Sequence, residues 1–512
     1  MTDLGNGRGY MGSHLAGASN DTIAAFATPI APTDGIGGGA IGVVRMSGPD
    51  AFRIAAHIFR GKKPFEKIKP YTIGYGYIFE HAPASGGHDR VVDEVLILKM
   101  NAPRSYTRED VVEIHCHAGA EVQRRILRLI LNSGARAAAP GEFTKRAFLN
   151  GRIDLSQAEA VMDIIKAKGE IGAATAMRQL DGALSKKLGA ARKQLIDLVA
   201  SLEAFLDFPE HEIEEQSILE IDGSLNAIAH MLRRLGESFE FGRIAREGAT
   251  AVIAGRPNVG KSTLLNLFAD YERAIVTEIP GTTRDVIEEY KNIGGFTVRF
   301  LDTAGIRETD DVIENMGIAR TLGAIEKADI ALLLFSADEG FCGGDARLVE
   351  ITRGIKRIFI INKIDLVQPG AIKEMRGAIK EVHGAIKEVY GEMHDTIING
   401  EMHDGSIIVE ASLINGEGFD EIVESIRSVF FGSSQAQADY GDAVLTNARH
   451  NALVSSAQEA IVAARATLGA GMPLEIPIID MRDALAAIGE ITGETYSEEI
   501  IDRIFSEFCV GK

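Results

Sequence analysis

The 512-residue sequence has few cysteines, no long apolar run and no excess of basic charge. Its three cysteines, Cys116, Cys342 and Cys509, lie far apart and match neither a disulfide framework nor a metal-ligand pair, which fits a reducing compartment. No apolar run reaches the roughly 18 residues of a membrane span, and the N-terminus has no charged segment followed by an apolar one. We therefore expect a cytoplasmic protein without a membrane segment.

Basic charge is scarce, because 54 Lys and Arg stand against 73 Asp and Glu, a formal net charge of −19. A broad nucleic-acid footprint requires a basic face that displaces phosphate counterions, so any RNA contact must be local or shared with a partner. Hydrophobic residues make up 46% of the chain, which is ordinary for folded protein. Since single cores stop growing at about 250 to 300 residues, the length predicts about two to four domains.

The sequence patterns divide the chain into regions of different character. Residues 1–20 are rich in Gly, Asn and Ser and predict a flexible extension. Residues 21–149 alternate strand-like runs with turn clusters, which predicts an α+β domain. Residues 150–248 and 436–512 show apolar residues at helical spacing, which predicts long helices that pack together. The fold class is therefore multidomain α+β and α/β, with residues 249–435 inserted as a separate domain into the helical one.

The inserted domain alternates short apolar runs with helical stretches, which predicts a mostly parallel sheet wrapped by helices. The expected strands are residues 251–254, 298–301, 330–335, 358–361 and 407–409.

A repeat lies inside this domain. Gly-Ala-Ile-Lys-Glu occurs at positions 370, 377 and 384, with apolar residues at alternating spacings of three and four, which is a heptad pattern. A glycine in each heptad costs a helix about 1 kcal/mol relative to alanine. We expect a surface insertion grown by duplication, with a binding helix as the alternative.

The strongest single signal is a phosphate-binding loop. The segment Gly255-Arg-Pro-Asn-Val-Gly-Lys-Ser262 follows an expected strand and opens a helix, as such a loop requires. Its glycines let backbone N–H groups approach phosphates, and the helix N-terminus favours negative charge. We expect Lys261 to reach the terminal phosphates and Ser262 to reach magnesium. The expected nucleotide contacts of this loop are Asn258, Val259, Gly260, Lys261, Ser262 and Thr263.

Two more motifs point to the metal ion and the γ-phosphate. The stretch Asp302-Thr303-Ala304-Gly305 ends an expected strand, which would place a carboxylate near magnesium and a backbone N–H near the γ-phosphate. Thr282 and Thr283, in the turn that begins at Gly281, can reach the same ion. After Gly305 comes Ile306, where many GTPases carry a water-orienting Gln, so another group must orient the water or hydrolysis must be slow.

The base is selected by Asn362-Lys363-Ile-Asp365, which follows another expected strand. The Asp365 carboxylate can accept hydrogen bonds from guanine N1–H and the exocyclic amino group. Adenine would leave this acceptor unpaired, at a cost of about 1 to 3 kcal/mol. The four motifs in this order predict a magnesium-dependent GTPase rather than an ATPase.

With Asn258, the Thr282-Thr283 turn and Ile306, the chain resembles the MnmE (TrmE) family of bacterial tRNA-modification GTPases. The terminal Phe508-Cys-Val-Gly-Lys512 matches the family's Cys-x-Gly-Lys signature, and residues 21–28, 140–150 and 153–160 agree as well. One departure is Ser412-Leu-Ile-Asn, where the family has Ser-Ala-Lys/Arg. Ser412 is still expected at the guanine, with a different aliphatic cover.

The resemblance implies a homodimer that works with the FAD-dependent partner MnmG in a heterotetramer-type complex and acts on tRNA. Together they would add an aminomethyl or carboxymethylaminomethyl group at C5 of the wobble uridine, using carbon from 5-formyl- or methylene-tetrahydrofolate. The positions that match the family's folate site are Arg45, Glu113, Arg152 and Lys512. Arg152 replaces a family lysine, which keeps the charge but not the shape. A surface ion pair is the alternative for each of these residues.

The resemblance also implies a GTPase that potassium switches on when two nucleotide domains meet. The matching potassium ligands are Asn258, Thr277, Ile279 and Thr282, and potassium would supply the charge of an arginine finger. Glu314 matches the family's water-positioning glutamate, with an exposed helix glutamate as the alternative. Thr283 and Asp302 complete the expected catalytic set.

Several readings stay open from sequence. A ribosome-biogenesis GTPase that acts by binding is the alternative function. Cys509 is a candidate for chemistry near the folate, although a lone terminal cysteine is more often inert. His115 and His117 flank Cys116 on an expected strand and resemble a metal pair, but no third ligand is evident.

Overall fold

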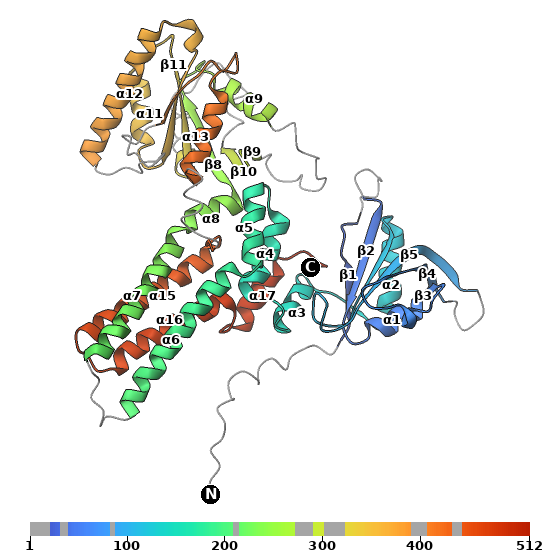
Figure 1. Ribbon diagram of the computed structural model, residues 1–512. Coiled ribbons are helices and arrows are strands. Elements are labelled where there is room, and N and C mark those ends of the chain that lie inside the picture. Colours follow the sequence, from blue (N-terminus) through green and yellow to red (C-terminus); the bar gives the residue numbers. More distant parts are fainter. Residues whose placement is uncertain are drawn as a thin grey trace. The chain divides into compact units, whose positions relative to one another are not determined.

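The computed structural model describes residues 21–30, 39–81, 88–207, 215–271, 290–301, 323–390, 407–432 and 443–511. Its contacts divide the chain into two compact units, one of Met1–Met162 with Gly489–Lys512 and one of Asp163–Ile488 (Figure 1). The expected domain limits stay a prediction; by contacts, the last residues of the chain belong with the N-terminal sheet.

The first unit is built on a seven-stranded sheet in the order β3-β4-β5-β6-β2-β1-β7. The strands are β1 Ile23–Phe26, β2 Ile41–Ser47, β3 Phe59–Gly61, β4 Ile73–Glu80, β5 Arg90–Met100, β6 Val111–His117 and β7 Arg136–Ala137. Apolar side chains of α1 (Ala51–Ile58) and α2 (Ala120–Asn132) pack with alternate residues of β2, β5 and β6 in one core. The opposite side of β4 and β5 is more open, since Ile73 and Tyr75 are more than half exposed.

The C-terminal tail is part of this unit. Helix α17 (Glu498–Ser506) contacts α3 (Glu142–Leu149), and their apolar residues share a core with the start of α4 (Leu155–Lys166). Val510 forms a bridge with Pro140, and Gly511 lies against β1. A Cβ on Gly511 would fall 1.9 Å from the carbonyl oxygen of Phe26, so only glycine fits there. The tail is therefore tightly packed on the N-terminal sheet within one chain.

The second unit contains long helices and a second sheet. Its helices are α5 Glu170–Leu180, α6 Ala183–Asp207, α7 Glu215–Glu237, α8 Phe239–Glu247, α15 Ala448–Gly469 and α16 Glu475–Thr492, the last of which runs past the unit boundary at Ile488. Helices α7 and α15, more than 200 residues apart in sequence, lie side by side (Figure 1) and are joined by an ion pair at 2.7 Å between Arg465 and Asp222. The two helical segments predicted on either side of the inserted domain do pack together.

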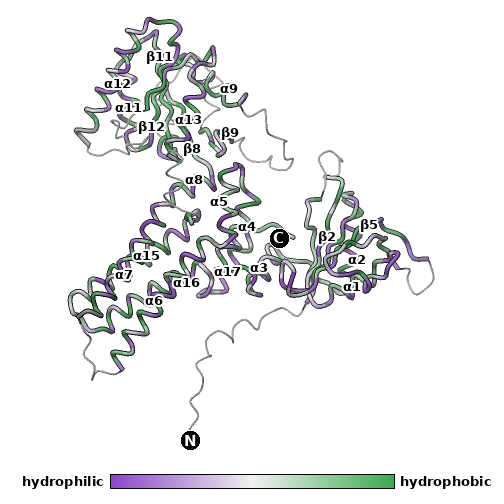
Figure 2. The backbone as a smooth tube through the Cα atoms, in the orientation of Figure 1, coloured by the Kyte–Doolittle hydropathy of each residue, from purple (hydrophilic) through white to green (hydrophobic). Residues whose placement is uncertain are grey.

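The second sheet has six strands in the order β13-β12-β11-β8-β10-β9 and is parallel except for the β9–β10 hairpin. The strands are β8 Ala249–Gly255, β9 Tyr290–Ile293, β10 Phe296–Leu301, β11 Ile330–Ser336, β12 Lys356–Asn362 and β13 Ile407–Glu410. Helices α9 (Lys261–Tyr271) and α13 (Phe419–Phe431) cover one face, and α11 (Gly343–Ile351) and α12 (Pro369–Tyr390) the other. The central strands are apolar, and the covering helices carry polar residues as well (Figure 2). The predicted fold class is confirmed.

One expectation was wrong. Helix α12 is formed by the Gly-Ala-Ile-Lys-Glu repeat, yet Met375, Ile379 and Ile386 are buried against β11 and β12. The heptad seam is therefore part of the domain core, not a surface insertion. The three repeat glycines have open space where a Cβ would stand, so they lie on the outer side. The duplicated Gly-Glu-Met-His-Asp segment after it lies outside the described residues.

Candidate functional sites

The phosphate-binding loop lies where β8 ends and α9 begins. Asn258 and Gly260 both have positive φ, at 60° and 105°, which turns the chain sharply before the first turn of α9. The Lys261 ammonium donates to the carbonyl oxygens of Gly255 at 2.9 Å and Arg256 at 2.7 Å. Burial lowers the pKa of Lys261. A cation held at a helix N-terminus makes this loop suited to bind phosphates.

Asn362, at the end of β12, is hydrogen-bonded to the phosphate-binding loop. Its Nδ2 donates to the carbonyl oxygen of Val259 at 2.8 Å, and its Oδ1 accepts from the N–H of Leu413 at 3.0 Å. A Cβ on Gly260 would lie 2.3 Å from this Nδ2, so the loop approaches Asn362 as closely as glycine allows. The base motif, the phosphate loop and the turn after β13 are thus joined through one buried side chain.

The Asp365 carboxylate, which was predicted to read guanine, is oriented from the turn after β13. Ser412 Oγ donates to Asp365 Oδ1 at 2.6 Å, and Asn415 Nδ2 donates to Ser412 Oγ at 3.0 Å. Lys363 has a φ of 63°, and its Nζ lies 3.4 Å from Asp338 Oδ2. Ile414 is 83% exposed, so the chain presents an apolar side chain where the family has Lys or Arg.

The sequence did not predict a further contact at this site. The guanidinium of Arg256, inside the loop, pairs with Asp345 at 3.0 Å and with Glu339 at 2.8 Å. Asp345 is fully buried and belongs to the first turn of α11. The only signal in the sequence is a basic residue after Gly255, and nothing local identifies partners more than 80 residues away.

The structure therefore brings part of the predicted nucleotide site to one edge of the parallel sheet, at the carboxyl ends of β8 and β12 and in the turn after β13, as expected for such folds. The residues that meet there are Asn258, Val259, Gly260, Lys261, Ser262, Thr263, Asn362, Lys363, Asp365 and Ser412. The remaining predicted residues lie outside the described ranges: Thr277, Ile279, Gly281, Thr282, Thr283, Asp302, Thr303, Ala304, Gly305, Ile306 and Glu314.

The first unit gathers three of the four residues that were matched to a folate site. Arg45 on β2 and Glu113 on β6 face each other in register, and Arg45 Nε and Nη2 both lie within 2.8 Å of Glu113 Oε1. Their side chains are only 18% and 15% exposed, so the pair is not a surface ion pair. The other Glu113 oxygen, Oε2, lies 3.4 Å from Nε2 of His115, a buried nitrogen with no hydrogen-bond partner among the described residues.

Tyr106 connects this pair to Arg152. Its ring centroid lies 5.7 Å from Cζ of Arg45 and 4.7 Å from Cζ of Arg152, within the range of cation–π contacts. Arg152 Nη1 also donates to the Tyr106 carbonyl oxygen at 3.3 Å. Lys512 lies outside the described residues, although Gly511 before it packs on β1.

The three cysteines differ in their exposure to solvent, and His117 forms an ion pair with a carboxylate. Cys116 is buried, and burial raises the pKa of its thiol to about 12, whereas Cys342 and Cys509 are exposed. His117 pairs with Asp93 at 2.7 Å, an interaction that raises the pKa of this imidazole. Among the described residues no group of three or more His, Cys, Asp or Glu side chains is placed to hold a metal ion.

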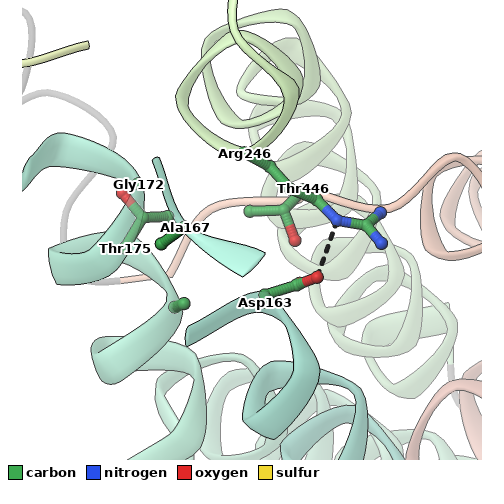
Figure 3. Close-up of a pocket in the computed structure, with 7 residues that line it drawn as sticks. Asp163, Ala167, Gly172, Thr175, Arg246 and Thr446 are labelled. Carbon is green, nitrogen blue, oxygen red and sulfur yellow. Dashed lines mark hydrogen bonds and ion pairs between the residues drawn. The ribbon is translucent and has the colours of Figure 1, made fainter. Parts of the chain in front are cut away.

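A small pocket in the second unit lies where α4, α5 and α8 meet the segment before α15 (Figure 3). Arg246 Nε pairs there with Asp163 Oδ1 at 2.8 Å, and Thr446 lies beside them. Gly172 contributes to its wall and lets α5 approach α8, because a Cβ would stand 2.4 Å from the Ala245 carbonyl oxygen. The residues that line it include none of the predicted site residues.

Comparison with known proteins decides the family. A model described as the MnmE helical domain matches residues 155–509, and one described as the GTP-binding protein TrmE N-terminus matches residues 22–152. The tRNA modification GTPase MnmE of Acetivibrio thermocellus is 44% identical over 493 residues, which cover 96% of this chain and 99% of that protein. The chain belongs to the MnmE (TrmE) family.

Other MnmE proteins agree. The tRNA modification GTPase MnmE of Geobacillus thermodenitrificans is 42% identical and covers 96% of this chain and 99% of its own length. A solved structure of Era with MgGDPNP and a segment of 16S ribosomal RNA is 27% identical, covers 41% of this chain and 66% of that chain, and has a TM-score of 0.25. A TM-score this low adds nothing to the family assignment.

This MnmE-family chain is a GTPase that acts in tRNA modification and binds GTP and Mg²⁺. The sequence motifs predicted the magnesium-dependent GTPase, and the family resemblance implied the role in tRNA modification. The ribosome-biogenesis alternative is set aside, because the matched relatives share both the N-terminal and the helical parts. Within the described residues, no helix is both long and apolar enough to span a bilayer.

Proposed function

We propose that this GTPase is activated by potassium and works as a homodimer with a FAD-dependent MnmG-type partner. Together they add an aminomethyl or carboxymethylaminomethyl group at C5 of the wobble uridine. A tetrahydrofolate bound to the N-terminal unit supplies the one-carbon unit. The observation that carries this proposal is the cluster of Arg45, Glu113 and Arg152 around Tyr106.

The chemistry of this cluster fits a folate. Glu113 Oε1 is occupied by Arg45, while Oε2 lies 3.4 Å from Nε2 of His115 and can accept a hydrogen bond from a pterin N–H edge. Arg152 has no acidic partner among the described residues and can pair with a carboxylate of the glutamate tail. The set thus offers an acceptor to the pterin and a cation to the tail.

The C-terminal tail supports the same placement. Gly511 packs on Phe26 of β1, and β1 pairs with β2, the strand that carries Arg45. The described tail up to Gly511 therefore belongs to the N-terminal unit of the same chain, and Lys512 is the next residue in the sequence. We infer that Lys512 is within reach of the folate and that Cys509 stands on the same segment.

The potassium proposal rests on the resemblance, with Asn258, Thr277, Ile279 and Thr282 as ligands. Asn258 has a positive φ of 60° in the phosphate-binding loop, so the backbone turns sharply at the position of this proposed ligand. Potassium would add positive charge where the γ-phosphate oxygens become more negative in the transition state. Glu314 would orient the attacking water with Thr283 and Asp302 near Mg²⁺.

The test pairs folate binding with wobble modification. Arg45→Ala is expected to weaken binding of 5-formyl-tetrahydrofolate in calorimetry, whereas the exposed Arg53→Ala serves as a matched control and should not. Deleting residues 509–512 is expected to abolish wobble-uridine modification of tRNA in cells and leave GTP hydrolysis largely intact. Unchanged folate binding in Arg45→Ala, together with normal wobble nucleosides in the truncated protein, would rule out this site.

A further inference from the structure

Tyr106 lies at the centre of the cluster but matches none of the positions assigned by the resemblance. Its hydroxyl hydrogen-bonds with Thr144 Oγ1 at 2.9 Å, which anchors the ring to α3. Thr144 is fully buried, so this anchor point is firm. The ring therefore stands at a defined place between β2 and the segment after α3.

Both arginines of the proposed folate site contact this ring. Cζ of Arg152 lies 4.7 Å and Cζ of Arg45 5.7 Å from its centroid. The two arginines stand more than 100 residues apart in sequence, Arg45 on β2 and Arg152 in the turn after α3, and Tyr106 is a side chain that both contact. Arg45 has further supports in Glu113 and in the ring of Phe143, whose centroid lies 5.8 Å from Cζ of Arg45. The Arg152 guanidinium is bound only through the ring and carbonyl oxygen of Tyr106 among the described residues, so its position depends most on this tyrosine.

We propose that Tyr106 is a positioning residue of the folate site, whose ring holds the Arg152 and Arg45 guanidinium groups at the spacing that the ligand requires. An aromatic face attracts a cation and leaves the in-plane N–H groups of the guanidinium free to donate. The arginines can therefore be held by the ring and still bind carboxylates or pterin acceptors. This inference rests on the proposed folate function of the same residues.

The consequence is a preference for aromatic side chains at position 106. Tyr106→Leu keeps an apolar side chain of moderate size but removes the ring, and we expect about tenfold weaker binding of 5-formyl-tetrahydrofolate. Tyr106→Phe keeps the ring and loses only the hydrogen bond to Thr144, so binding should weaken much less than in Tyr106→Leu. Stronger folate binding by Tyr106→Phe than by Tyr106→Leu would distinguish a role of the aromatic ring from a general loss of packing.

The chain has no tryptophan, which makes a direct test possible. Tyr106→Trp introduces a single indole, the ring with the strongest cation–π attraction, at the site itself. In full-length protein, its fluorescence should change on titration with 5-formyl-tetrahydrofolate and saturate at the affinity that calorimetry gives. Tyr71→Leu is the matched control, because Tyr71 is an exposed tyrosine of the same unit with its hydroxyl on two backbone carbonyls.

The outcomes separate this inference from the proposed function. If the unchanged protein does not bind 5-formyl-tetrahydrofolate, both are overturned. If it binds and Arg45→Ala weakens binding, but a folded Tyr106→Leu binds as well as Tyr71→Leu, only the role of Tyr106 is refuted. The role of Tyr106 would also be refuted if calorimetry records folate binding by the Tyr106→Trp variant but its indole fluorescence does not change. Circular dichroism melts of each variant establish that the chain is folded.

Discussion

Asn362 offers a sharp test of how the nucleotide site is held together. Its side chain is 4% exposed and supports the phosphate loop through Val259 and the turn after β13 through Leu413. Asn362→Ala removes both hydrogen bonds at once. It leaves the carbonyl oxygen of Val259 and the N–H of Leu413 without these partners, in two residues that are almost completely buried.

An unsatisfied buried polar group costs about 1 to 3 kcal/mol, so the two together amount to about 2 to 4 kcal/mol when some rehydration is allowed. If this energy is lost mainly from the nucleotide-bound loop, GTP affinity falls by about 30- to 1000-fold, because each 1.4 kcal/mol is about a factor of ten. Any part of this free energy that does not reduce GTP affinity should appear as a lower melting temperature of the nucleotide domain.

The assay is titration with a fluorescent GTP analogue, together with a thermal melt with and without nucleotide. Asn226→Ala is the control, because Asn226 is exposed and accepts one hydrogen bond from Arg465. Its affinity for nucleotide should not change. A folded Asn362→Ala variant with both wild-type GTP affinity and wild-type melting temperature would refute the reasoning.

Four more outcomes are expected. Asp365→Asn should shift preference from GTP toward xanthosine triphosphate in competition binding, since the carboxylate that accepts from guanine is lost; unchanged selectivity would contradict the base assignment. Hydrolysis should rise with K⁺ much more than with Na⁺ and increase with protein concentration, and equal rates in both salts would contradict the potassium proposal. Glu314→Ala should lower kcat strongly with little change in nucleotide affinity, because a water-orienting group acts in the transition state; a loss of binding would indicate a structural role. Since the thiolate is the nucleophile and burial raises the pKa of Cys116 to about 12, iodoacetamide at pH 8 should label Cys342 and Cys509 but leave Cys116 unmodified in the folded protein, as mass spectrometry can check.

The sequence predicted most of the nucleotide domain because its strands are short apolar runs with turn residues at their ends. Each of the five expected strands is present, as β8, β10, β11, β12 and β13. In the N-terminal unit, the alternation of strand-like runs and turn clusters over residues 21–149 likewise predicted an α+β domain, and this region contains strands β1 to β7 with helices α1 and α2. Strand β9 was not predicted, because Tyr-Lys-Asn-Ile has a weak apolar pattern, even though Gly294-Gly295 marks the turn to β10.

Long-range contacts could not be predicted in the same way. The pairs Arg256–Asp345 and Tyr106–Arg45 join residues that only the strand order brings together. The heptad repeat of α12 was misjudged for a related reason. Its period describes which residues share a face but not what that face meets, and here it meets a sheet rather than another helix.

The repeat in α12 also bears on how the length of this helix can change. Seven residues make close to two turns, so each added copy extends a helix by about 10.5 Å and returns its apolar side chains to nearly the same side. Duplication in this unit therefore lengthens the helix without rotating its core face, whereas insertion of five or six residues would turn that face away from the sheet. A segment that grows in whole heptads can change in size while Met375 and Ile379 keep their places in the core.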